Sequence, residues 1–301
     1  MINSKMNDKS FWQAALTIPK NISRDMEVFM IKAGALGFHE LLYAEGITEN
    51  LHNDNTIHYY YFSPDFPAKA FVPMVLGIFE CPDSEYEIKQ VFYEEFLKTM
   101  EETFTPFMAT PRIWIVPPWK TDHSVEEKKL IINPAFAFGT GRHATTRLML
   151  EVMEQMDFQG KKVLEMGCGS GILSIASIMM GASHVVGVDV ESLSVESSME
   201  NFLANREYHN FKSMAEFHEG DFSWLQKNPD YKFQIFLSNI LPEIFYQNES
   251  DFLKFLHASQ TWIISGIVEE KEEEFYNWII ELSGESTIHR MKKEDWVVFY
   301  K

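Results

Sequence analysis

The second half of the chain alternates between two hydrophobic patterns. Short apolar runs, typical of buried strands, are each followed by a longer stretch whose apolar positions recur with the spacing of one helix face. The strands expected from this pattern cover residues 163–166, 185–189, 214–219, 233–238 and 262–265, and the helices cover 145–156, 171–180, 192–206, 243–257 and 269–282. Two β-like runs, 286–291 and 296–300, follow. This order predicts an α/β fold with a doubly wound, mostly parallel sheet and an antiparallel C-terminal hairpin.

The first part of the chain has a mixed pattern. Alternating or β-branched runs predict strands at residues 11–18, 39–45, 56–62, 75–79 and 112–116. Helical spacing predicts helices at 23–36, with Ser23 as a candidate N-cap, and at 88–100. We therefore expect a small N-terminal α+β domain over residues 1–116, a linker with two prolines and a charged run over 117–129, and a second domain over 130–301.

Composition narrows the classes of function. No apolar run approaches the roughly 20 residues that a membrane span needs, and the N-terminus lacks the apolar core of a signal peptide. The two cysteines lie far apart and the ten histidines show no ligand spacing. We therefore expect a protein of the reducing cytoplasm without a disulfide or a metal site.

The net charge of −18 is spread over the whole chain. Residues 1–128 carry 11 basic and 19 acidic side chains, and residues 129–301 carry 15 and 25. Because neither half offers a basic surface for a phosphate backbone, direct nucleic-acid binding is not expected. A basic protein partner fits this charge better. The alternative is that the acidity mainly aids solubility.

A glycine-rich turn joins the first strand of the second domain to its helix. Gly167, Gly169 and Gly171 fit G-x-G-x-G, but Ile172 stands where a dinucleotide-binding motif has its last glycine. Glu165 would also oppose a pyrophosphate. An acid at this place suits a cationic ligand, and the segment resembles the first motif of class I S-adenosylmethionine methyltransferases. The alternative is a tight strand–helix turn without a ligand.

Polar residues follow three other predicted strands. Asp189, at the end of the second strand, can accept hydrogen bonds from two ribose hydroxyls. Asp221, after the third strand, is a candidate for the adenine edge, although Gly-Asp is also an ordinary turn pair. Asn239, after the fourth, can hold an amine through its carbonyl oxygen without favouring ammonium as a carboxylate would. The alternative for Asp189 is an exposed loop residue, and the alternative for Asn239 is a residue that caps the strand end.

The segment 133–146 is rich in glycine and threonine and precedes a predicted helix. Phe138 can present an aromatic face to a sulfonium. Thr140, Gly141 and Thr145 are candidates for the methionine end of the same cofactor. The alternative is a loop whose threonines cap the helix.

Together these segments resemble the ribosomal protein L11 methyltransferase family. Residues 133–146 resemble D-P-G-x-A-F-G-T-G-x-H-x-T-T, residues 163–189 resemble the family's cofactor motif, and residues 238–241 resemble its A-N-I-L motif. Residues 112–119 resemble the strand that leaves the family's N-terminal domain, and residues 264–267 and 294–297 resemble later family segments. The chain departs from the first motif at Asn133 and Ala135, and Arg142 and Ala144 stand where the family has threonine and proline around His143. The resemblance covers most of residues 110–301, and the first 90 residues match only in outline.

The resemblance implies a function. The N-terminal domain would recognise a ribosomal large-subunit protein, the linker would let the domains move, and the second domain would methylate lysine and N-terminal amines with S-adenosylmethionine. We expect a monomer, with Asn239 as the catalytic residue, also in contact with the cofactor. Two alternatives remain: a methyltransferase of the same fold for another protein or a small molecule, and a non-catalytic S-adenosylmethionine-binding module.

Overall fold

The chain forms two compact units, Met1–Phe104 and Thr105–Lys301, called unit 1 and unit 2 below. A computed structural model describes residues 10–35, 37–40, 54–92, 94–95, 98, 101, 104–125, 128–134 and 140–301. Each unit has its own hydrophobic core.

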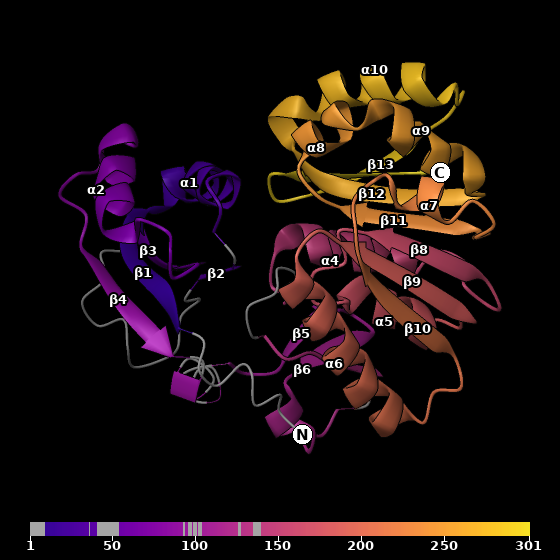
Figure 1. The fold of residues 1–301 in the computed structure, drawn as a ribbon, viewed down its shortest axis with the longest axis horizontal. Coiled ribbons are helices and arrows are strands. Elements are labelled where there is room, and N and C mark those ends of the chain that lie inside the picture. Colours follow the sequence, from indigo (N-terminus) through magenta and orange to yellow (C-terminus); the bar gives the residue numbers. More distant parts are fainter. Residues whose placement is uncertain are drawn as a thin grey trace. The chain divides into compact units, whose positions relative to one another are not determined.

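Unit 1 is a four-stranded antiparallel sheet with two helices on one face (Figure 1). Its strand order is β2-β3-β1-β4. The elements are β1 (Ser10–Pro19), α1 (Lys20–Lys32), β2 (Gly37–Glu40), β3 (Asn55–Phe62), α2 (Ala68–Ile78) and β4 (Tyr86–Phe92). Alternate residues of β1, such as Leu16 and Ile18, pack against Met30 of α1 and Val72 of α2. The predicted α+β organisation of the N-terminal part is confirmed.

One predicted element of unit 1 is wrong, and another is wrong in its first part. The strand expected at 75–79 belongs to α2, because the buried positions Val72, Val75 and Leu76 have helical spacing once the preceding turn is included. Residues 88–92 of the helix expected at 88–100 lie in β4, which pairs with β1 along its whole length, whereas Glu94, Glu95 and Lys98 are helical as expected. The first helix also begins earlier than expected, at Lys20, with Pro19 as its N-cap. Residues 41–45 of the second predicted strand lie outside the described residues.

Unit 2 begins with a small three-stranded sheet. Its strands are β5 (Phe107–Thr110), β6 (Ile113–Val116) and β7 (Lys128–Ile131), and only β6 was expected from the sequence. β6 pairs antiparallel with β5 and parallel with β7. The segment predicted as a linker, residues 117–129, thus follows β6 within unit 2, and its last two residues, Lys128 and Lys129, begin β7.

A seven-stranded sheet forms the centre of unit 2, in the order β10-β9-β8-β11-β12-β14-β13. Its strands are β8 (Lys162–Met166), β9 (His184–Asp189), β10 (Met214–Glu219), β11 (Ile235–Asn239), β12 (Thr261–Val268), β13 (His289–Lys293) and β14 (Trp296–Tyr300). The first five are parallel to one another, and β14 runs antiparallel to both of its neighbours. The predicted doubly wound sheet with an antiparallel C-terminal hairpin is confirmed.

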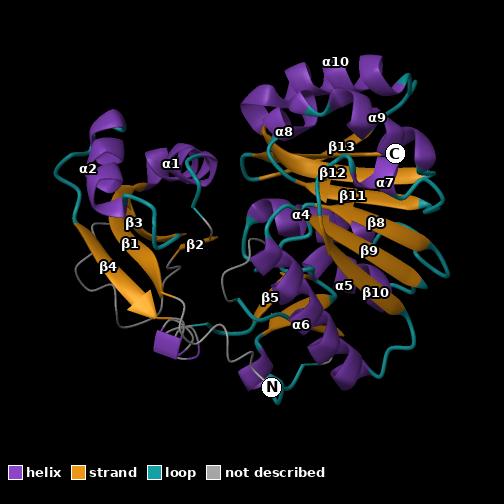
Figure 2. Ribbon diagram, viewed as in Figure 1, coloured by secondary structure: helices purple, strands orange, loops and turns teal. Residues whose placement is uncertain are grey.

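Helices cover both faces of this sheet (Figure 2). One face carries α4 (Ala144–Met153), α5 (Ile172–Met179) and α6 (Ser192–His209), and the other carries α7 (Trp224–Lys227), α8 (Pro242–Gln247), α9 (Glu249–Ala258) and α10 (Glu272–Ser283). Successive strand residues point to opposite faces. On β8, Val163 therefore joins the core under α4 and α5, and Leu164 joins the core under α8 and α9. The helix expected at 243–257 is divided at Asn248 into α8 and α9.

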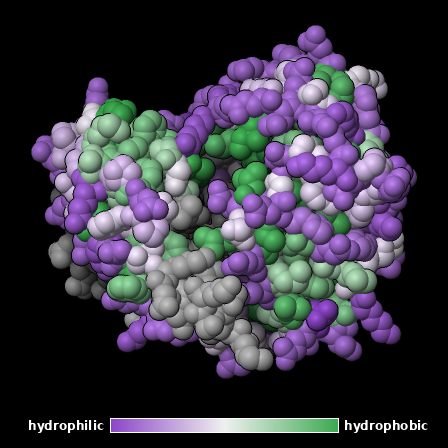
Figure 3. All heavy atoms as spheres, viewed as in Figure 1, coloured by the Kyte–Doolittle hydropathy of each residue, from purple (hydrophilic) through white to green (hydrophobic). Residues whose placement is uncertain are grey.

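The layer formed by α8–α10 presents mainly polar side chains on the face seen in Figure 3. Among the described residues, no helix combines the length and apolar character that crossing a bilayer demands.

Candidate active site

The carboxyl ends of the two central strands, β8 and β11, meet at the point where the strand order reverses. From β8 the chain proceeds outward through β9 and β10, and from β11 it proceeds the other way through β12. Crevices at such switch points are the usual ligand sites of doubly wound sheets. The two strand ends are in direct contact, because a Cβ added at Gly167 would lie 2.4 Å from Ile240 Cγ2.

The turn after β8 depends on glycine. Gly167, Gly169 and Gly171 have φ values of 76°, 53° and 76°, a region that side chains strongly disfavour. A Cβ at Gly171 would also come within 3.0 Å of Ser198 on α6. The backbone thus passes close to the loop after β11 on one side and to α6 on the other.

Asp189 lies beside this turn. Its carboxylate accepts hydrogen bonds from the backbone N–H of Gly169 at 2.8 Å and of Glu191 at 3.0 Å. Burial raises the pKa of Asp189, and these backbone donors oppose that shift. Each carboxylate oxygen can accept more than one hydrogen bond, so the pair of ribose bonds predicted from the sequence stays compatible with these contacts.

Glu165 has a different environment. It is 1% exposed, and its carboxyl accepts a hydrogen bond from the Ser174 hydroxyl on α5. Burial raises its pKa to about 8. At neutral pH the carboxyl therefore holds a proton unless a cation lies next to it.

Asn239 ends β11, and its side chain reaches the start of α4. Its Nδ2 donates to Thr145 Oγ1 at 3.1 Å. Its Oδ1 is buried without a hydrogen-bond partner among the described residues. Buried polar atoms in proteins are seldom left unpaired. An oxygen that no described residue pairs, at a sheet switch point, is therefore a place where a ligand can donate.

The loop before α4 is described from Thr140 onward, and Phe138 lies outside the described residues. Gly141 has φ of 86°, and a Cβ there would lie 2.0 Å from Ile115 Cδ1 of β6. Arg142 donates to the Thr105 carbonyl at 3.1 Å, which attaches the loop to the small sheet.

The end of β10 approaches the end of β9, since the Gly220 N–H bonds the Asp189 carbonyl at 2.8 Å. Asp221 is exposed, and its carboxylate accepts hydrogen bonds from the backbone and the hydroxyl of Ser223. These bonds lower its pKa. Such contacts are typical of an ordinary Gly-Asp turn, which was the alternative to a role of Asp221 at the adenine edge.

Sequence reasoning missed a polar face of α6 that supports the glycine turn. Ser198 donates to the Gly169 carbonyl at 2.9 Å, and Asn201 donates to the Ser170 carbonyl at 2.9 Å. Asn205 bonds both backbone groups of Ile131 on β7. The spacing 198, 201, 205 places all three on one helix face, and that spacing was the signal available in the sequence.

The whole arrangement matches a known family. A family model described as ribosomal protein L11 methyltransferase (PrmA) matches residues 25–301. The chain belongs to this family. It is 32% identical over 214 residues to the ribosomal protein L11 methyltransferase of Anoxybacillus flavithermus. This match covers 70% of this chain and 66% of that protein. It is 39% identical over 120 residues to the corresponding protein of Aliivibrio salmonicida, which covers 40% and 41%.

The chain spans between half and about two thirds of the length of the first curated relatives it matches. Among solved structures, the ribosomal protein L11 methylase of Lactobacillus delbrueckii subsp. bulgaricus has a TM-score of 0.54 and 24% identity, and the match covers 65% of this chain and 97% of that one. This likeness shows the shared fold.

Proposed function

We propose that this chain is an S-adenosylmethionine-dependent protein N-methyltransferase that modifies lysine and N-terminal amines of a ribosomal large-subunit protein. Membership of the family and the names of the relatives support the reaction and the substrate class. One structural observation carries the proposal. The buried Oδ1 of Asn239, which has no partner in the part of the chain that the structure describes, stands at the switch point of the sheet, beside a glycine turn flanked by two buried acids.

The residues present fit the cofactor. Asn239 Oδ1 provides an acceptor that the described residues leave unused. Asp189 would bind the ribose, and Glu165 would face the positive charge. The rest of the cofactor would be lined by the glycine turn and by Thr140, Gly141 and Thr145. Asp221 would lie beside the adenine. S-adenosylmethionine, when bound, supplies a methyl group attached to a sulfonium.

The remaining chemistry belongs to the protein. Free lysine has a pKa of about 10.4, so the acceptor amine must lose a proton before it can attack. A partly desolvated pocket favours the neutral amine. Asn239 Oδ1 would accept one amine N–H and leave the nitrogen lone pair free. The site would then act mainly by orienting the acceptor amine toward the methyl group. Such positioning lowers the barrier to methyl transfer without a covalent intermediate on the protein.

We assign substrate recognition to unit 1. The family resemblance supports this role, and the acidity of the chain suits a basic ribosomal protein. The proposed partner is therefore a protein, and its site of action is the cytoplasm, where ribosomal proteins are available.

Radiolabelled S-adenosylmethionine tests the function. The enzyme is incubated with large ribosomal subunits from cells that lack it, and separately with whole lysate of the same cells. Label on a basic ribosomal protein is expected. Asn239→Ala should lower turnover more than cofactor affinity measured by calorimetry, whereas the matched variant Asn248→Ala, outside the site, should behave as wild type.

Two other outcomes overturn the proposal. Label on another protein or a small molecule, with none on ribosomal proteins, would leave the reaction intact and replace the substrate. Cofactor binding without transfer to any component of the lysate would identify a binding module.

A further inference from the structure

A chain of hydrogen bonds links His143 to Asn239 through Thr145. His143 is the N-cap residue of α4, and its Nδ1 accepts from the Thr145 backbone N–H at 3.3 Å. The same Nδ1 lies 2.7 Å from Thr145 Oγ1. Thr145 Oγ1 in turn lies 3.1 Å from Asn239 Nδ2. Thr145 is 1% exposed, so bulk water does not compete for its hydroxyl.

The direction of every bond in this chain follows from its first member. A backbone N–H is always a donor, so the His143 Nδ1 that faces it carries no proton. With its lone pair toward Thr145, Nδ1 also accepts the hydroxyl proton. The hydroxyl oxygen is then an acceptor toward Asn239, and only the amide NH₂ can satisfy it. The Oδ1 of Asn239 is therefore turned away from Thr145.

We propose that His143 is a positioning residue, which fixes the orientation of the Asn239 amide through Thr145. The inference rests on the function proposed above, and it adds a reason for that orientation. If the amide were reversed, its NH₂ would donate to the nitrogen lone pair of the acceptor amine and block attack. With Oδ1 presented, the amide takes an amine N–H and leaves the lone pair free.

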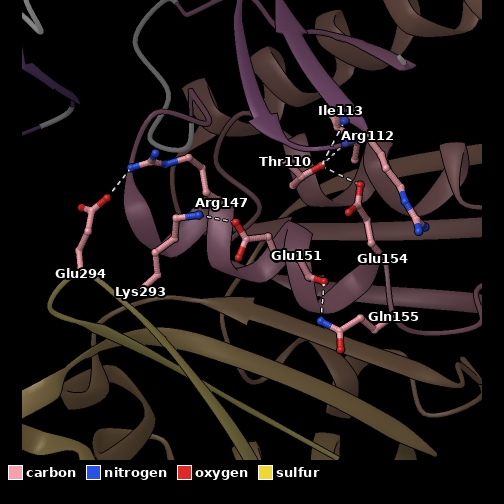
Figure 4. Close-up of polar contacts among 9 residues, drawn as sticks. All are labelled: Thr110, Arg112, Ile113, Arg147, Glu151, Glu154, Gln155, Lys293 and Glu294. Atoms are coloured by element: carbon pink, nitrogen blue, oxygen red, sulfur yellow. Dashed lines mark hydrogen bonds and ion pairs between the residues drawn. The ribbon is translucent and has the colours of Figure 1, made fainter. Parts of the chain in front are cut away.

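The imidazole ring is held in place from its other side. Trp296 at the start of β14 contacts the His143 ring edge to face, with ring centroids 4.8 Å apart. The hairpin turn next to Trp296 is fastened to α4 by two ion pairs, Arg147 with Glu294 and Lys293 with Glu151 (Figure 4). The C-terminal hairpin thus positions the residue at the beginning of the chain of bonds.

The first test reads the protonation of His143 directly. In ¹⁵N-labelled wild-type protein, the imidazole ¹⁵N shifts and couplings should identify the neutral form protonated at Nε2, with Nδ1 as an acceptor. Assignment uses the spectrum of His143→Asn, in which this signal disappears. A proton found on Nδ1 would overturn the inference, whatever the enzyme does to its substrate.

The second test uses turnover. Thr145→Val keeps the backbone N–H that caps the helix and removes only the hydroxyl. Both Thr145→Val and His143→Ala should lower kcat about tenfold, the effect of losing one orienting hydrogen bond. The double variant should be no slower than either single variant, because both break one chain. His143→Asn, whose Oδ1 can replace Nδ1 as acceptor and N-cap, should stay within about threefold of wild type.

Two results would contradict the proposed relay, the chain of hydrogen bonds from His143 through Thr145 to Asn239. Additive losses in the double variant would mean that the residues act separately, and equal losses in His143→Ala and His143→Asn would mean that the acceptor atom is irrelevant. Wild-type protein that transfers no methyl group would refute the proposed function instead, and the relay would then be judged on the protonation of His143 alone.

Discussion

Glu165→Gln offers a direct test of the electrostatics of the site. The change removes the ionisable group, keeps the shape, and retains an oxygen that can accept the Ser174 hydrogen bond. In the folded chain the pKa of Glu165 is about 8, against an ordinary value of 4.5. The folded state thus binds the proton more tightly than the unfolded state, and the stabilisation from this proton is fully present below pH 4.5. It is lost as the pH rises through 8.

The size of the effect follows from the shift. One pKa unit corresponds to about 1.4 kcal/mol, so the free energy of unfolding should fall by up to about 5 kcal/mol across the whole window. Between pH 5 and pH 9 the fall attributable to Glu165 is up to about 4 kcal/mol. Glu165→Gln has no proton to lose, so its stability should exceed that of wild type increasingly as the pH rises.

Urea unfolding of both proteins at pH 5, 7 and 9, followed by circular dichroism, measures this difference. Other titrating groups cancel because they are common to both proteins. Asp221→Asn is the control: Asp221 is exposed, and its pKa is lowered, so its titration lies below the pH range used. A difference between Glu165→Gln and wild type that does not change from pH 5 to pH 9 would show that Glu165 is ionised throughout and would refute the reasoning.

Three further changes have defined outcomes. Gly141→Ala should destabilise unit 2 in urea by about 2–5 kcal/mol, since it combines positive φ with a severe clash; Gly160→Ala, at φ of 69° in open space, should cost only about 1–2 kcal/mol. Asp189→Ala should weaken S-adenosylmethionine binding in calorimetry by about 1.5–3 kcal/mol, and unchanged affinity would remove it from the site. Arg147→Ala should change the stability by at most about 1 kcal/mol, because its partner Glu294 is largely exposed; a larger loss would show that the pair contributes more than an exposed ion pair does.

The sheet of unit 2 could be predicted because its signals are local. Strands β8, β9 and β11 are short, mainly apolar runs closed by glycine or a polar residue, and helices such as α4 and α9 have a regular apolar face. The strands β5 and β7 were missed for the opposite reason. β7 carries two lysines in its first two positions, and only its pairing with β6 makes it a strand. The same holds for β4, where β1 supplies the hydrogen bonds.

The candidate site also has a part that could be predicted from local signals and a part that could not. The glycine turn was found because positive φ restricts the residue type at the position itself. The polar face of α6 and the role of His143 were not found, because each acts through a hydrogen bond to a residue remote in the sequence or in another element. A polar side chain on a helix gives no sign of being buried until the fold places a carbonyl opposite it.

The two acids beside the glycine turn are buried alike but are supported differently, and this difference bears on how the site works. Asp189 is held by backbone N–H groups of two loops, which stabilise its anionic form in place. Among the described residues, Glu165 is supported by the hydrogen bonds of Ser174, and burial raises its pKa to about 8, so its negative charge is costly near neutrality. A cationic ligand next to Glu165 would remove that cost.

A cationic ligand favours the carboxylate form of Glu165 by the same free energy with which the carboxylate favours the ligand. Binding of such a ligand near pH 7 must therefore release a proton from Glu165. Calorimetry in buffers of different ionisation enthalpy would detect that proton for S-adenosylmethionine, and Glu165→Gln would abolish it. Binding without proton release in wild type would mean that Glu165 does not face the cation.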